Sequence, residues 1–229
     1  MSAEPAPWPG HSGTTRYLLT LAAGAANAFG FLALGVFTSV VTANSALLGL
    51  RLGSAEPATA GSVAVALLGY LVGAAAGTVV SAGRGRVPGS GIRGGLLLEV
   101  LSLWLVTGGW LIWHGAPHGG GRVLLLLLTA MAMGCQNAGV RVTAGGDVTT
   151  AYLTGLLTSI VTAFVGQGRL SVRNVGVVLS LVAGAAAEGA AYRWLHTGAP
   201  LVPVLLVTAA LAATWAGSTA RVTAVPVEP

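Results

Sequence analysis

Uncharged polar side chains interrupt two apolar stretches of this chain, and their types and spacing could serve chemistry. The first stretch runs from Tyr17 to Leu50 and has no charged residue. Its polar members include Asn27, Thr38, Ser39, Thr42, Asn44 and Ser45. The second set is Gln136, Asn137, Thr149, Thr150, Thr154, Thr158 and Ser159. Amides and hydroxyls at membrane depth either bond helices together or line a polar cavity, so the chemistry they favour is solute binding.

We expect the lining of such a cavity to come from both sets. The residues expected to bind a substrate are Asn27, Thr42, Asn44, Gln136, Asn137, Thr150 and Thr154. The alternative is that these side chains only join helices, which is worth about 0.6 kcal/mol each on average. In that case the protein is a structural or regulatory membrane protein with no substrate path.

Two acids, Glu99 and Glu188, lie well inside apolar stretches, where a carboxyl group is a functional candidate. Glu188 is expected to face a cavity or to be protonated, because a lone buried charge is costly. Glu99 lies near a helix end, from which it could reach water. His114 and His118 are separated by Gly115 and Pro117, which spoils a shared helical face for a metal. We found no metal-ligand pair, Ser/His/Asp set or nucleotide motif, so we expect neither an enzyme nor a metal or cofactor.

Composition places the chain in the membrane. Hydrophobic residues make up 54% of it, charged residues only 7%, and the mean hydropathy is +0.81. A soluble domain carries about 25% charged residues. These values predict an all-α polytopic membrane protein whose surroundings are the lipid bilayer. The formal charge of +5 indicates basic cytoplasmic loops rather than a nucleic-acid partner.

Apolar segment lengths predict six spanning helices, since one crossing needs about 20 residues. Two shorter polar helices, 38–50 and 148–166, add to these as re-entrant or broken helices. Three short segments recur later in the chain at offsets of 110, 112 and 111 residues, which indicates an internal duplication. The matching segments are Asn27-Ala28 with Asn137-Ala138, Thr42-Ala43 with Thr154-Gly155, and Gly73–Ala76 with Gly184–Ala187. We expect one transmembrane domain, 16–218, with repeat halves of about 16–113 and 122–218, and tails 1–15 and 219–229.

Arginine placement favours the six-span topology. With re-entrant short helices and cytoplasmic termini, eight arginines lie inside and three outside; with eight crossings, the split is six to five. Three spans per half makes the halves inverted, so the short helices would dip in from opposite faces, as in many transporters. The leading function is therefore a transporter or permease for a small polar or anionic solute. Gly69, Gly73 and Gly77 form a GxxxG face that suits helix packing or a homo-oligomer.

Two segments carry a resemblance to a known family. The first is AGAANAFGFLALGVFTSVVTANSALLGL, and the second is MGCQNAGVRVTAGGDVTTAYLTGLLTSI. They resemble the signatures of the YoaK family of bacterial membrane proteins, a domain of unknown function, over about residues 14–218. The resemblance implies a multi-pass protein of the bacterial inner membrane and no settled activity. Asn27 stands where that family usually has Asp, and Ala43 where it usually has Gly. The first departure removes the carboxylate on which a proton-coupling role at that position would rest.

Overall fold

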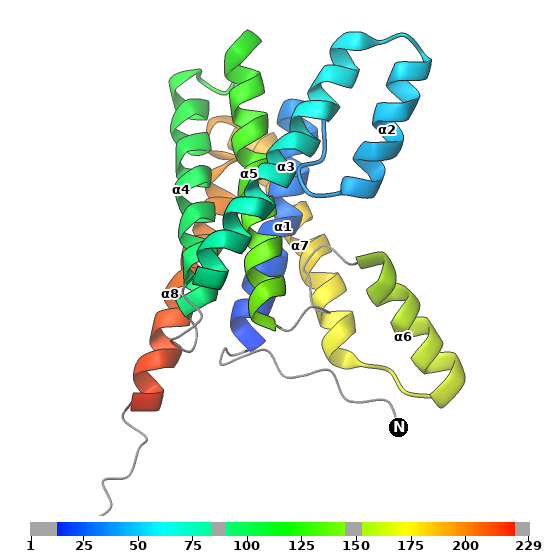
Figure 1. Ribbon diagram of the computed structural model, residues 1–229, viewed down its shortest axis with the longest axis vertical. Helices are drawn as coiled ribbons and strands as arrows, with labels where there is room; N and C mark the ends of the chain where they lie inside the picture. Colours follow the sequence, from blue (N-terminus) through cyan, green and yellow to red (C-terminus); the bar gives the residue numbers. More distant parts are fainter. Residues whose placement is uncertain (1–12, 84–89, 145–152, 223–229) are drawn as a thin grey trace, which may run out of the picture.

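The computed structural model describes residues 13–83, 90–144 and 153–222, and within these ranges all regular structure is helical (Figure 1). The helices are α1 (Gly13–Leu34), α2 (Val41–Gly53), α3 (Pro57–Gly83), α4 (Ser90–Ile112), α5 (Gly119–Ala144), α6 (Leu153–Gln167), α7 (Val172–Trp194), the 3-10 turn η1 (His196–Gly198) and α8 (Leu201–Val222).

Six of these helices are long and apolar enough to cross a bilayer: α1, α3, α4, α5, α7 and α8. The other two, α2 and α6, have 13 and 15 residues and are too short to cross upright at 1.5 Å per residue. The predicted all-α architecture of six spans and two short helices is confirmed. α2 begins later than expected, at Val41, and the expected start of the other short helix at 148 lies outside the described residues.

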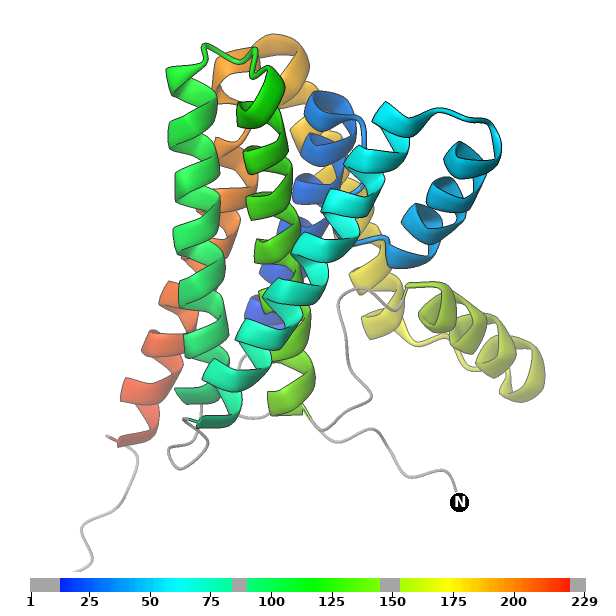
Figure 2. The ribbon, with the colours of Figure 1, turned by 45° about the horizontal axis from the view of Figure 1, so that its top comes forward.

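Two helix pairs form the centre of the bundle. α3 packs along α5, and α7 packs along α1, while α4 and α8 flank the centre. Both ribbon views show α2 and α6 projecting from the same side of the bundle (Figures 1 and 2). α2 lies toward one end of the long axis and α6 toward the other.

Glycines let the paired helices approach almost to backbone contact. A Cβ added to Gly184 of α7 would lie 2.0 Å from the Leu21 carbonyl oxygen of α1, and one on Gly24 would lie 2.1 Å from the Leu181 carbonyl oxygen. In the other pair, a Cβ on Gly73 would lie 2.0 Å from the Met131 oxygen, and one on Gly134 would lie 2.2 Å from the Tyr70 oxygen. Each residue of the α1–α7 contact thus corresponds to a residue of the α3–α5 contact 110 or 111 positions away.

The Gly69, Gly73 and Gly77 face packs against α5 of the same chain. Added Cβ atoms would meet the carbonyl oxygens of Leu127, Met131 and Cys135 at 2.7, 2.0 and 2.8 Å. The predicted packing role of this face is therefore correct. Because α5 already covers it, the face is not available to a second copy of the chain.

α1 ends at Gly35, whose φ of 76° lies in the left-handed region that glycine adopts without strain. The Gly35 and Val36 amides donate to the Phe31 and Gly30 carbonyl oxygens at 3.1 and 3.2 Å, which closes the helix end. The chain then turns back along α1: an added Cβ on Gly30 would lie 2.5 Å from Thr38 Cγ2. This return places the start of α2 beside the body of α1 rather than beyond its end.

The arginines divide between the two ends of the bundle (Figure 1). The end that holds the start of α1 has Arg16, Arg93, Arg141, Arg169, Arg173 and Arg221. The opposite end has Arg51, Arg122 and Arg193. Arg122 donates to the Leu34 carbonyl oxygen at 3.0 Å and so caps the end of α1. Among the described residues, the basic excess lies at the end where α1 begins and α8 ends.

Candidate functional site

A cavity of about 1060 Å³ lies among α1, α3, α5 and α7, on the side of the bundle where α2 and α6 attach. Helix α1 supplies Asn27 and its neighbours, and α5 supplies Asn137 and Arg141. Tyr70 comes from α3, while Leu181 and Ala185 come from α7. A volume of this order accommodates a small organic molecule.

Both short helices begin at this cavity. Val40, Val41 and Thr42 line it from the start of α2, and Leu153 and Thr154 line it from the start of α6. Since no side chain caps the N-terminus of α2 at Val40, the first turn of that helix presents backbone N–H groups at the cavity edge. The positive ends of the two helix dipoles therefore meet one solute-sized space.

Asn27 holds the returning segment in place. Its side-chain oxygen accepts hydrogen bonds from the Thr38 and Ser39 amides at 3.2 and 2.9 Å, and its side-chain nitrogen donates to Ser39 Oγ at 2.7 Å. The same nitrogen donates to the Ala23 carbonyl oxygen at 2.9 Å. Irregular backbone at membrane depth needs such partners because no water replaces them. Asn27 thus has a structural role and also lines the cavity.

The structure brings together four of the seven residues expected to bind a substrate: Asn27, Thr42, Asn137 and Thr154 all line the cavity. Thr150 lies outside the described residues. Asn44 and Gln136 are not part of the lining, contrary to expectation.

The side chains of Asn44 and Gln136 bond to backbone instead. Asn44 donates to the Phe37 carbonyl oxygen at 2.6 Å, and Gln136 donates to the Leu19 carbonyl oxygen at 2.8 Å. Asn44 therefore fixes the returning segment, and Gln136 joins α5 to α1. Both are buried, so their polar groups serve the fold where we expected them to face a solute.

The lining residues that escaped the sequence argument include Phe31, Phe37, Tyr70 and Arg141. Apolar and aromatic residues in a spanning helix give no sign of facing a cavity rather than lipid. Arg141 lies near the end of α5 and lines the cavity. Tyr70 of α3 and Asn137 of α5 both line the cavity, and spacing alone does not reveal that they border the same space.

The lining residues fall largely into pairs related by the spacing of the duplication, 110 to 112 positions. The pairs are Asn27 with Asn137, Ala28 with Ala138, Phe31 with Arg141, Leu32 with Val142, Val41 with Leu153, Thr42 with Thr154, Tyr70 with Leu181, and Ala74 with Ala185. Corresponding positions of the two halves therefore face one another across a single space.

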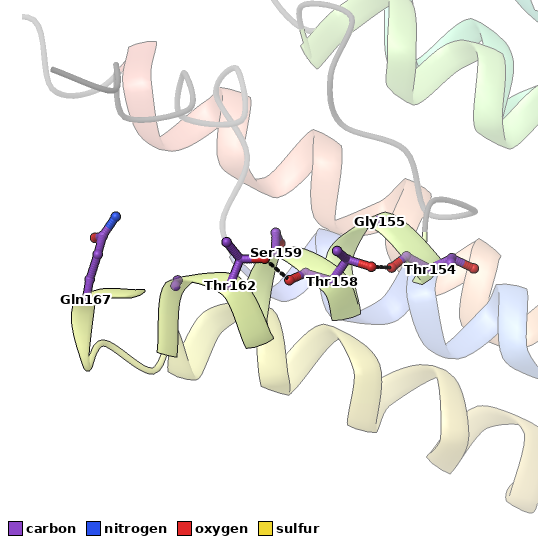
Figure 3. A pocket seen from close by; sticks show the side chains of 7 residues that line it. Thr154, Gly155, Thr158, Ser159, Thr162 and Gln167 are labelled. Atoms are coloured by element: carbon purple, nitrogen blue, oxygen red, sulfur yellow. Dashed lines mark hydrogen bonds between the residues drawn. The ribbon is translucent and has the colours of Figure 1, made fainter. Parts of the chain in front are cut away.

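A second hollow, of about 700 Å³, follows one face of α6 (Figure 3). Figure 3 shows Thr154, Thr158 and Thr162 in a row along that helix. Thr158 and Thr162 donate to carbonyl oxygens one turn back, at 3.0 and 2.8 Å. α6 has no buried residue, and these hydroxyls are already satisfied by their own helix. We therefore assign the functional site to the larger cavity.

The two intramembrane acids lie apart from the cavity lining. Glu99 and Glu188 are both completely buried, and neither carboxyl group has a hydrogen-bond partner among the described residues. Glu99 therefore does not reach water, because α4 packs against α5 there and covers it. Glu188 is one turn beyond Ala185 of the lining but does not reach the cavity itself.

The described residues hold no cluster of His, Cys, Asp and Glu that could bind a metal ion.

Comparison with known proteins gives two matches. The model of a family described as "Protein of unknown function (DUF1275)" matches residues 16–213. The UPF0700 transmembrane protein YoaK of Bacillus subtilis (strain 168) is 29% identical over 155 residues, which cover 66% of each chain, just under two thirds. No solved structure matches.

Proposed function

Because this chain belongs to the DUF1275 family, whose function is unknown, we propose a function from the cavity itself: passage of a small polar or anionic solute through the membrane. The protein is a multi-pass membrane protein with a solute-sized space at the junction of its two short helices. The single observation that carries the proposal is the meeting of Thr42 and Thr154, one from each short helix, in one cavity.

An inverted repeat explains why the cavity lies where it does. Two halves of opposite orientation would each bring one broken element to mid-membrane, and the recurrence of the glycine contacts and of the lining pairs supports this arrangement. Rocking of one half against the other would open the cavity to each side in turn. Hydroxyls, amides and helix N-termini would replace the hydration of the solute in the meantime.

We place the start of α1 and the end of α8 on the cytoplasmic side of the bacterial inner membrane. The basic excess at that end of the bundle supports this orientation under the positive-inside rule. An impermeant thiol reagent should therefore leave Ser90→Cys unlabelled in intact cells, in a Cys135→Ser background. Labelling of that residue from outside would reverse the orientation.

Transport predicts a loss of flux when a cavity hydroxyl is removed. Thr154→Val keeps the side-chain shape but deletes one polar contact, so we expect solute entry to fall about three- to ten-fold with the fold intact. The measurement is uptake of radiolabelled benzoate, lactate, alanine and glycerol into liposomes that contain the purified full chain, above the uptake of protein-free liposomes.

Thr158→Val is the matched control. Thr158 lies one turn further along α6 and is absent from the lining of the larger cavity, so its variant should retain wild-type flux. Equal flux for the two variants, or no flux of any solute with wild-type protein, would favour a structural or regulatory membrane protein with no substrate path.

A further inference from the structure

The chemical class of the solute can be inferred from the lining pairs whose two members differ in side-chain chemistry. Polar pairs at the centre are alike: Asn27 matches Asn137, and Thr42 matches Thr154. Two other pairs differ in kind. Phe31 of α1 corresponds to Arg141 of α5, and Leu181 of α7 corresponds to Tyr70 of α3. The second half thus gains a positive charge where the first half has an aromatic ring.

Arg141 and Tyr70 make one end of the cavity polar and positive. Arg141 is exposed near the end of α5 and lies close enough to Tyr70 to act on it electrostatically. Tyr70 and Asn137 line the same cavity and add a hydroxyl and an amide to it. Among the described lining residues there is no acid, so nothing in that lining neutralises the guanidinium. A fixed cation in a partly apolar cavity attracts an anionic group, and a guanidinium suits a carboxylate through paired N–H donors.

The opposite end of the cavity is aromatic. Phe31 and Phe37 stack with their ring centroids 4.8 Å apart and their planes at 16°. Both rings line the cavity, although 51% of Phe31 is exposed. Stacked rings with a face left open offer an apolar wall to a flat or branched hydrocarbon group.

We propose that the cavity takes a small organic monoanion with an apolar body. Its acid group lies at Arg141 and Tyr70, and its body lies along Phe31 and Phe37. This inference rests on the proposed function of the cavity as a solute site and adds the class and orientation of the solute.

Three molecules of the same shape and different charge test this assignment: benzoate, benzamide and benzylamine. The measurement is competition with radiolabelled benzoate for the purified full chain in detergent. We expect benzoate to bind about ten-fold more tightly than the neutral and cationic analogues, as befits one charge-assisted contact. Arg141→Gln should abolish that preference, and Arg141→Lys should restore part of it. Arg169→Gln, which changes an exposed arginine outside the lining, should bind as wild type does.

The possible results separate this inference from the proposed function. If liposomes carry alanine or glycerol but the protein binds benzoate no better than benzamide or benzylamine, transport stands and the monoanion assignment is overturned. A benzoate preference that survives Arg141→Gln would overturn the role of Arg141. Failure of all three probes to bind also overturns the assignment. If no solute crosses either, the proposed function fails as well.

Discussion

Replacing Asn27 with Leu should destabilise the protein by about 2–6 kcal/mol, because two backbone N–H groups at membrane depth lose their acceptor and each costs about 1–3 kcal/mol. Those groups belong to Thr38 and Ser39, which donate to Asn27 Oδ1 at 3.2 and 2.9 Å. Leu cannot accept a hydrogen bond, and Thr38 and Ser39 are both buried, so their amides would lose the acceptor that Asn27 supplies. The returning segment should then detach from α1.

Asn27→Asp is the matched variant, since its carboxyl group keeps an oxygen that can accept from both amides, although it replaces the side-chain N–H donor with an ionisable group. Its stability should lie much closer to that of the wild type than to that of Asn27→Leu. Thermal or denaturant unfolding of the purified protein in detergent gives the comparison. A wild-type stability for Asn27→Leu would show that the segment after Gly35 is held by other contacts.

The second large effect is expected at the glycines of the helix pairs. In Gly184→Ala the new Cβ would lie 2.0 Å from the Leu21 carbonyl oxygen, far inside van der Waals contact, and both atoms belong to rigid helices. α1 and α7 must separate, so we expect a loss of about 1–3 kcal/mol or more. Gly73→Ala should behave in the same way, because its Cβ would lie 2.0 Å from the Met131 oxygen.

Two other glycines supply controls on the same helices. A Cβ on Gly189 of α7 or on Gly61 of α3 would have nothing within 4 Å. Gly189→Ala and Gly61→Ala should therefore be neutral or more stable by about 0.5–1 kcal/mol, as alanine is the better helix former. The measurement is the unfolding midpoint of all four variants in one detergent. Equal midpoints for Gly184→Ala and Gly189→Ala would contradict the close approach of α1 and α7.

The fold was largely predictable from the sequence because a bilayer sets the length of each span. The lengths of the apolar runs predicted the six spanning helices. Asn27 and Asn137 could be singled out because amides at membrane depth are uncommon and recur at one spacing. The small-residue spacing of Gly69, Gly73 and Gly77 indicated a packing face but not the partner helix, which depends on how the chain folds back.

The site was predictable only in part, since a polar side chain in a membrane can serve either the fold or a solute. Asn44 and Gln136 have the same chemistry as Asn27, yet they bond to the carbonyl oxygens of Phe37 and Leu19 and stay out of the cavity. Phe31 and Tyr70 line it although their spacing resembles that of any spanning helix. Which face of a helix borders a cavity is decided by its neighbours, and one sequence does not specify those contacts.

One measurement tests the shared cavity most directly: the reaction rate of Thr42→Cys with a charged thiol reagent, in a Cys135→Ser background. The thiol should react, because Thr42 borders the cavity from the start of α2. A large side chain at position 154 should then slow the reaction, since Thr154 borders the same space from α6. We expect Thr154→Trp to slow it several-fold and Thr158→Trp to leave it unchanged. An unreactive Thr42→Cys, or equal rates in the two tryptophan variants, would contradict a single cavity served by both short helices.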